Sequence, residues 1–232
     1  MCASEKVPGP LSRVRRPVFC YITDRHQLPV ASFPALISNM RRVLSWGVDF
    51  IQLREKDLPD RELLKLTKNA VALACGTQCR ILVNGRPDVA LAGGAHGVHL
   101  PSAGIRASDL RPHLPIGFVL GVSTHSLREA RRAAVDGADY ILLGPIFRTA
   151  SKIGYGNPLG LNHFSRICSA LSIPVFGLGG IGPDRIGRVL KAGASGIAGI
   201  SLFQQNLHLL SRSSNNWRTQ RLSERNEPTW TR

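Results

Sequence analysis

A short polar run, Gln52-Leu53-Arg54-Glu55-Lys56, follows an apolar stretch that reads as a β-strand. Side chains alternate across a strand, so Gln52, Arg54 and Lys56 would share one face. Two cations on one inward face are costly without an anion to pair with them. Arginine suits a bidentate contact with phosphate, and lysine acts as a point charge. The run therefore favours anion binding. The alternative is a solvated strand end in which Glu55 and Asp57 pair with the cations.

A glycine-rich segment, 177–182, has the pattern Gly-x-Gly-x-x-Gly. A dinucleotide-binding domain would continue with several strands and an acidic residue after this pattern. Only one further strand is predicted here, so we reject that interpretation. We expect instead a phosphate cup in which the backbone amides of Gly179 and Gly180 approach the oxygens. Ile200 and Ser201, at the end of the last predicted strand, would complete this cup.

A long loop, 144–160, contains Thr149, Ser151 and Lys152 among glycines. Hydroxyls and a lysine in such a loop suggest that it folds over a ligand and excludes water. Asn84, at the end of another strand, could add a side-chain amide, although Asn-Gly is also an ordinary turn pair.

Three histidines deserve separate interpretations. His125 follows a predicted strand, where an imidazole could act as acid or base near neutral pH. The alternative is a histidine that only caps the next helix. His96 and His99 are three residues apart on one strand, hence on opposite faces, and a shared metal is not expected. No metal site is predicted.

Strands must alternate with helices to bring these residues together. Apolar runs at 18–23, 48–53, 80–84, 97–100, 118–122, 140–143, 173–177 and 196–200 alternate with helical or polar stretches. Glycine-containing corners precede the second, fourth, sixth and eighth runs, where glycine ends a helix. We therefore predict a single (β/α)8 TIM barrel over 18–211, with the phosphate site after strands 7 and 8. Residues 1–17 and 212–232 are predicted to be basic, disordered ends.

Composition excludes several classes of protein. The 232 residues have a net charge of +15 and a pI of about 10.8, which suggests an anionic partner. No apolar run is long enough for a membrane helix, and no secretory signal is evident. The five cysteines form no zinc-site spacing, so reduced thiols and a cytoplasmic location are expected. Nucleic acid is not an expected partner, because no aromatic residues are interleaved with the basic ones.

These motifs closely resemble the thiamine phosphate synthase and thiazole tautomerase (TenI-type) superfamily. The resemblance spans about residues 18–205 and includes the segments 21–24, 52–56, 121–125, 144–152 and 179–181. It implies small phosphorylated thiamine precursors as substrates. It also implies a pyrimidine-diphosphate site formed by Gln52, Arg54, Lys56, Asn84, Ser123 and Lys152. A thiazole-phosphate site would be formed by Thr149, Ala150, Ser151, Gly179, Gly180, Ile200 and Ser201.

Two departures from the superfamily pattern guide the choice of activity. Synthases resembling this chain have two Mg²⁺-binding aspartates where Gly85 and Gly104 stand here. Diphosphate chemistry usually needs that metal. We therefore predict a thiazole tautomerase-like isomerase without a cofactor, in which His125 moves the proton. The alternative is a Mg²⁺-dependent thiamine phosphate synthase that joins pyrimidine diphosphate to thiazole phosphate. A non-catalytic sensor of thiamine intermediates is a second alternative. The oligomeric state stays open, with a homodimer as one option.

Overall fold

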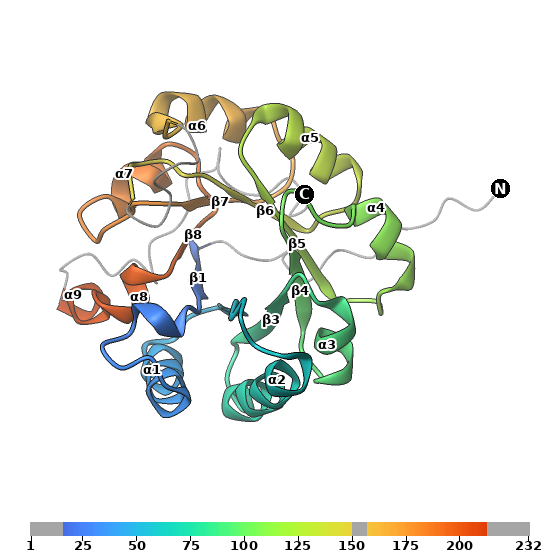
Figure 1. Ribbon diagram of the computed structural model, residues 1–232. Coiled ribbons are helices and arrows are strands. Elements are labelled where there is room, and N and C mark those ends of the chain that lie inside the picture. The colour runs from blue at the N-terminus through green and yellow to red at the C-terminus, as the bar shows by residue number, and fades with distance from the viewer. Residues whose placement is uncertain (1–15, 150–156, 213–232) are drawn as a thin grey trace.

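Parallel strands close into a complete barrel in the computed structural model, which describes residues 16–149 and 157–212 (Figure 1). The strands are β1 (Val18–Ile22), β2 (Phe50–Leu53), β3 (Arg80–Asn84), β4 (Gly97–Leu100), β5 (Val119–Thr124), β6 (Tyr140–Leu143), β7 (Val175–Leu178) and β8 (Gly196–Gly199). Each strand pairs with the next, and β8 pairs with β1, which closes the sheet. The predicted (β/α)8 architecture is confirmed. Strand β5 runs on to Thr124, two residues beyond the prediction, and this places Ser123 within the strand.

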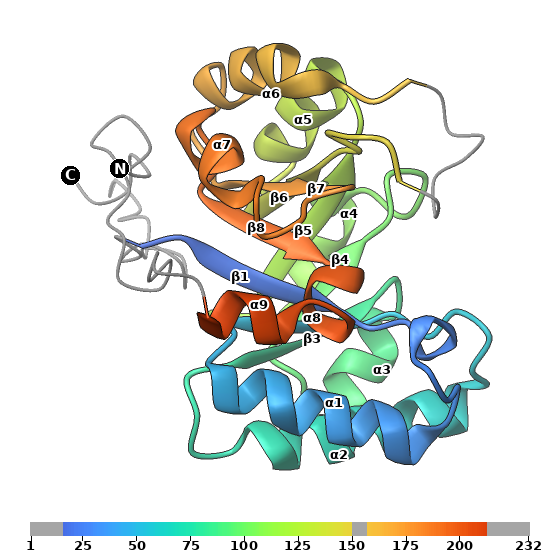
Figure 2. The same ribbon diagram turned by 90° about the vertical axis from the view of Figure 1, so that its left-hand side faces the viewer.

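Helices surround the barrel and shield the outer face of its strands (Figure 1). They are α1 (Phe33–Trp46), α2 (Asp60–Ala74), α3 (Pro87–Ala92), α4 (Ala107–Leu110), α5 (Leu127–Val135), α6 (Gly160–Ser169), α7 (Ile186–Lys191), α8 (Ser201–Gln204) and α9 (Leu207–Arg212). The last predicted helix, 202–211, is split into α8 and α9. Helix α8 lies against β1 (Figure 2). The centroids of the Phe203 and Tyr21 rings, one from each element, are 5.9 Å apart. No helix in the described ranges is both long and apolar enough to cross a membrane.

Alternation along the strands separates two apolar cores. Every second strand residue points inward, and these residues form a cluster inside the barrel that includes Phe50, Leu82, Tyr140 and Phe176. The intervening residues pack against the helices in a larger outer cluster. Because the interior is filled by side chains, it is a packed core, and ligands must bind at an end of the barrel.

The predicted glycine corners have a physical basis. Gly47, Gly94, Gly137 and Gly193 all have positive φ, between 69° and 105°, a conformation that ends a helix readily only with glycine. In three of these corners, the side chain of the residue directly before the even-numbered strand accepts a hydrogen bond from the backbone of the preceding odd-numbered strand. The carboxylates of Asp49 and Asp139 accept the backbone N–H groups of Phe19 and Leu120, at 2.8 Å and 2.7 Å. His96 Nδ1 accepts the N–H of Ile81 at 3.0 Å in the same way.

The two basic ends predicted for the chain lie almost entirely outside the described residues. Arg16, at the first described position, forms an ion pair with Asp49, so the chain is attached to the barrel from this residue onward.

Candidate active site

A row of polar side chains crosses the inner face of four consecutive strands. Gln52, Asn84, His99 and Ser123 occupy inward positions on β2, β3, β4 and β5, near the carboxyl ends of the strands. Asn84 is the register partner of His99, and Nε2 of His99 lies 2.8 Å from Oγ of Ser123. The barrel therefore brings together three residues predicted for the pyrimidine-diphosphate site, Gln52, Asn84 and Ser123. His99 joins them. In the sequence it was considered only as a metal ligand together with His96, and no shared metal was expected.

One amide pair leaves an acceptor open to a ligand. The Nε2 group of Gln52 donates to Oδ1 of Asn84 at 3.0 Å. Gln52 is buried, and its Oε1 atom has no hydrogen-bond partner among the described residues. An unsatisfied buried carbonyl costs free energy, which a ligand N–H group could recover.

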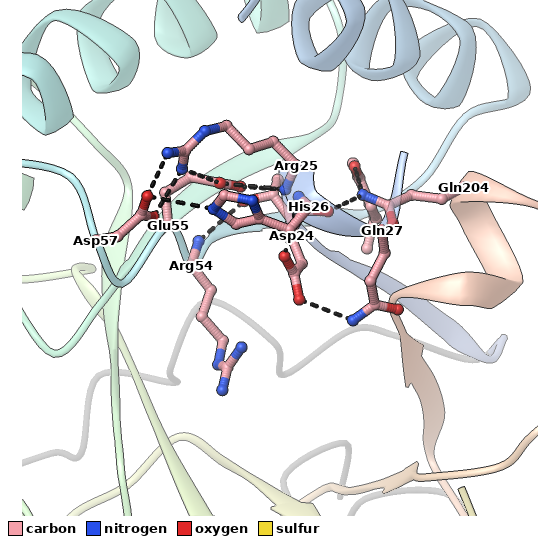
Figure 3. Close-up of polar contacts among 10 residues, drawn as sticks. Asp24, Arg25, His26, Gln27, Arg54, Glu55, Asp57 and Gln204 are labelled. Atoms are coloured by element: carbon pink, nitrogen blue, oxygen red, sulfur yellow. Dashed lines mark hydrogen bonds and ion pairs between the residues drawn. The ribbon is translucent and has the colours of Figure 1, made fainter. Parts of the chain in front are cut away.

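Arg54 directs an unpaired guanidinium into the barrel mouth. Its backbone N–H donates to Oγ1 of the buried Thr23 at 2.9 Å, while the side chain extends away from the surrounding polar cluster (Figure 3). No described residue forms a hydrogen bond or ion pair with this guanidinium. A half-buried cation without a partner is suited to an anionic ligand. Lys56, predicted beside it, lies past the end of β2 and is exposed.

The nearby carboxylates are already engaged by a residue that the sequence interpretation did not single out. Glu55 accepts the backbone N–H of Arg25 and, at 3.0 Å, its guanidinium. Arg25 also forms a bidentate pair with Asp57, and His26 contacts the same carboxylate (Figure 3). The hydrogen bonds from Arg25 lower the pKa of Asp57 below its usual range. Glu55 and Asp57 thus pair with Arg25, and neither of them neutralises the charge of Arg54.

The loop after β1 is fixed from two further sides. Asp24 accepts the backbone N–H of His26 and the Nε2 group of Gln27, the latter at 2.7 Å. Gln204, at the end of α8, donates to the carbonyl oxygen of Asp24 and to the hydroxyl of Tyr21 (Figure 3). Together with the Arg25 contacts, these bonds make one rim of the mouth rigid.

The predicted phosphate cup has a backbone that requires glycine. Gly179 and Gly180 follow β7 with φ of 96° and 66°. A Cβ at Gly179 would lie 2.6 Å from Pro145, and one at Gly180 would lie 2.6 Å from the carbonyl oxygen of Arg148. The loop after β7 thus packs backbone to backbone on the loop after β6, and Phe147 N–H donates to Gly179 O at 3.1 Å.

The remaining cup residues are placed in part. Ile200 and Ser201 follow β8, which neighbours β7, so they lie at the same edge of the barrel as the glycines. Thr149 is half-buried at the end of a described segment. Ala150, Ser151 and Lys152 lie outside the described residues.

His125 is exposed at the rim, directly after β5, and is held at both its backbone and its ring. Its N–H donates to the Glu129 carboxylate at 2.8 Å, and Ser126 accepts the N–H of Glu129. Nδ1 lies 2.5 Å from the carbonyl oxygen of Gly144. A carbonyl only accepts, so Nδ1 carries a proton, and this bond joins the ends of β5 and β6.

The described residues do not fit the two-aspartate magnesium pattern of the resembling synthases. They include no cluster of three or more His, Cys, Asp or Glu side chains that could hold a metal ion. Gly85 stands where the first aspartate is expected, and the adjacent Arg86 already pairs with two carboxylates, those of Asp60 and Asp88. No step below is therefore assigned to a metal.

Comparisons with known proteins show the family to which the chain belongs. The family model described as thiamine monophosphate synthase matches residues 19–203. The thiamine-phosphate synthase of Moorella thermoacetica is 43% identical over 162 residues, which cover 70% of this chain and 77% of that protein. That of Roseiflexus castenholzii is 38% identical and covers 80% of each chain. The solved thiamine phosphate pyrophosphorylase from Pyrococcus furiosus superposes with a TM-score of 0.72 at 32% identity, over 82% of this chain and 89% of that one.

The predicted thiazole tautomerase activity is therefore wrong, because the similar proteins are named as synthases and favour the alternative activity. The prediction gave most weight to the two missing carboxylates. It gave too little weight to Gln52, Asn84 and Ser123, which lie on one inner face near Arg54, a residue whose guanidinium has no partner among the described residues. The proton-moving role of His125 was predicted only as part of that reaction, and we do not assign it to the synthase. On the match across residues 19–203, the chain belongs to the thiamine monophosphate synthase family.

Proposed function

We propose that this protein is a thiamine-phosphate synthase that joins a pyrimidine diphosphate to a thiazole phosphate and releases diphosphate. The observation that supports this most is the guanidinium of Arg54, which pairs with no described residue and lies beside the inward row of Gln52, Asn84 and Ser123. This arrangement offers one cation, a hydroxyl and an open amide acceptor to a ligand that has both a diphosphate and a nitrogen heterocycle. We assign the second phosphate to the glycine cup after β7, whose backbone packs so closely on the loop after β6 that only glycine fits.

The reaction breaks one carbon–oxygen bond of the pyrimidine diphosphate and forms one bond to the thiazole. The electron pair of the broken bond leaves with the diphosphate, so negative charge grows on the departing oxygen. Arg54 and the Ser123 hydroxyl would stabilise that charge, and Lys152 is proposed to assist. The Oε1 atom of Gln52 would accept a hydrogen bond from the pyrimidine and fix its orientation. The glycines at 179 and 180, with Thr149, Ala150, Ser151, Ile200 and Ser201, would hold the thiazole phosphate.

Purified protein incubated with both substrates and Mg²⁺ tests this proposal. Thiamine phosphate and diphosphate should appear in equal amounts, at rates that saturate with each substrate. Tight binding of both substrates without turnover would contradict the proposal and support the sensor. A homodimer and a cytoplasmic location stay predictions from the sequence.

A further inference from the structure

A line of buried hydrogen bonds runs from the core of the barrel to its mouth. The hydroxyl of Tyr140, on β6, lies 3.0 Å from Nδ1 of His99, on β4. Nε2 of His99 lies 2.8 Å from Oγ of Ser123, on β5. Tyr140 and His99 have no exposed surface, whereas Ser123 is partly exposed at the mouth. The line therefore connects the ligand site to a part of the core that no ligand contacts.

Gly121 makes this line possible. It lies on β5 between the other two strands, and it is the register partner of both His99 and Tyr140. A Cβ at Gly121 would lie 2.2 Å from Cζ and 2.4 Å from the hydroxyl oxygen of Tyr140. Only a glycine leaves room for the tyrosine hydroxyl to pass β5 and reach His99. Phe176 stacks on the Tyr140 ring with centroids 4.7 Å apart, which fixes the direction of that hydroxyl.

The hydrogen-bonding capacity of each group sets the direction of the protons. Among the described residues, the Tyr140 hydroxyl has His99 Nδ1 as its single hydrogen-bond partner, so the buried phenol proton is satisfied only if Nδ1 accepts it. In a neutral imidazole the proton is then on Nε2, which donates to Ser123 Oγ. Burial, with a smaller contribution from Arg54, lowers the pKa of His99 to about 3, so the ring stays neutral near pH 7. Ser123 accepts from inside, and its own proton is left to point outward.

We propose that His99 is a positioning residue: Tyr140 holds it as the Nε2–H tautomer, and it makes Ser123 a hydrogen-bond donor toward the diphosphate. The identity of this ligand rests on the proposed function. A donor is needed there because the departing oxygen becomes more negative as its bond to carbon breaks. The contact strengthens in the transition state, so losing the orientation should lower kcat more than it raises KM.

Nuclear magnetic resonance of protein labelled with ¹⁵N-histidine tests the tautomer without any turnover. Two-bond ¹H–¹⁵N correlations should show His99 with a protonated Nε2 and an unprotonated Nδ1, unchanged from pH 5 to pH 9. The spectrum of His99→Gln identifies the signal among the seven histidines of the chain. An Nδ1–H tautomer, or an imidazolium in this range, would overturn the proposal.

Tyr140→Phe tests the consequence with little change in shape. It should lower kcat about tenfold, because losing one charge-assisted hydrogen bond in the transition state slows a reaction by about that factor. KM should change much less. In a Ser123→Ala background the same change should have no further effect. Thr67→Val is the control, because it also removes a fully buried side-chain hydroxyl, one that bonds the carbonyl oxygen of Leu63 within α2, and it should leave kcat near that of the wild type. If Tyr140→Phe lowers kcat by the same factor in the wild-type and Ser123→Ala proteins, the proposal is contradicted.

Two further measurements separate this proposal from the proposed function. His99→Gln keeps one acceptor and one donor and should retain more activity than His99→Leu, provided both fold. Affinity for inorganic diphosphate, measured by calorimetry, needs no turnover and should fall in Tyr140→Phe and in Ser123→Ala without adding in the double variant. If the affinity for diphosphate falls in this non-additive way while no thiamine phosphate forms, the proposed function fails and the positioning role stands. If thiamine phosphate forms while Tyr140→Phe has the same kcat as the control Thr67→Val, the positioning role fails.

Discussion

The guanidinium of Arg25 lies 3.0 Å from the carboxylate of Glu55, and the backbone N–H of Arg25 donates to the same carboxylate. This pairing joins the loops after β1 and β2. It also engages the carboxylate adjacent in sequence to Arg54, and no described residue pairs with the Arg54 guanidinium itself (Figure 3). The anion site that we propose at Arg54 thus depends on a second arginine, Arg25, which holds the neighbouring carboxylate.

Replacing Arg54 should mainly weaken binding of the pyrimidine diphosphate. Arg54→Gln removes a charged donor worth about 1.5–3 kcal/mol, so KM for this substrate should rise on the order of tenfold to a hundredfold. Arg54→Lys should recover part of the loss, since it restores the charge without the bidentate geometry. Steady-state kinetics and calorimetry with inorganic diphosphate measure both effects. Arg41→Gln, an exposed change on α1, is the control. Equal effects at both positions would remove Arg54 from the site.

The glycine cup should tolerate no side chain. Gly180→Ala places a methyl group 2.6 Å from the carbonyl oxygen of Arg148, at a φ of +66°. The loop must shift, and KM for the thiazole phosphate should rise by about tenfold. Gly117→Ala is the matched control, because Gly117 also has positive φ but open space around its Cβ position. If both variants raise KM equally, backbone strain explains the result and the cup does not.

Restoring the first of the two missing carboxylates, at position 85, should let the enzyme work at a lower Mg²⁺ concentration. A Cβ at Gly85 would meet nothing closer than Pro101 at 3.7 Å, so Gly85→Asp fits, and aspartate tolerates positive φ better than most residues. The Mg²⁺ concentration for half-maximal activity should fall severalfold. Gly94→Asp imposes similar strain in open space at a helix corner and should leave the requirement unchanged. An identical Mg²⁺ dependence in wild type and Gly85→Asp would refute this prediction.

The Arg25 pair should contribute a stability that is lost in acid. Its hydrogen bonds lower the pKa of Asp57 from the ordinary 3.8, so the folded state favours the ionised form. That stabilisation is present at neutral pH and disappears as the pH falls below 3.8 and through the lowered pKa. Asp57→Asn should therefore be less stable than wild type in urea at pH 7, and the difference should shrink in acid. Asp184→Asn, a more exposed carboxylate, should show a smaller difference at pH 7. If the difference in stability between Asp57→Asn and wild type is the same at every pH, the stabilisation does not come from the ionised carboxylate of Asp57.

The barrel itself could be predicted because its signals are local. Strand-length apolar runs and glycines at 47, 94, 137 and 193 repeat along the chain, and each glycine adopts the positive φ that its corner requires. The inward row at the mouth was predictable in part, since alternation assigns Gln52 and Arg54 to one face. Alternation stops where β2 ends at Leu53, which is why Lys56 does not follow the same pattern.

The missed features depend on contacts between distant strands. Arg25 and Glu55 are 30 residues apart, and nothing in either local segment indicates that they pair. The hydrogen bonds of His99 to Tyr140 and Ser123 form only because β4, β5 and β6 lie side by side and Gly121 leaves space for the Tyr140 ring. The activity was mispredicted for a different reason. The two absent carboxylates received more weight than the rest of the pattern, whereas the proteins similar to most of this chain are named as synthases.

The most direct test of the proposed function is a single-turnover measurement with pyrimidine diphosphate bound to excess enzyme and thiazole phosphate added with Mg²⁺. We expect thiamine phosphate and diphosphate to form together in one exponential phase, and we expect Arg54→Gln to slow or abolish that phase. Stoichiometric binding of both substrates with no new carbon bond, in wild-type protein over a range of Mg²⁺ concentrations, would contradict the proposed function.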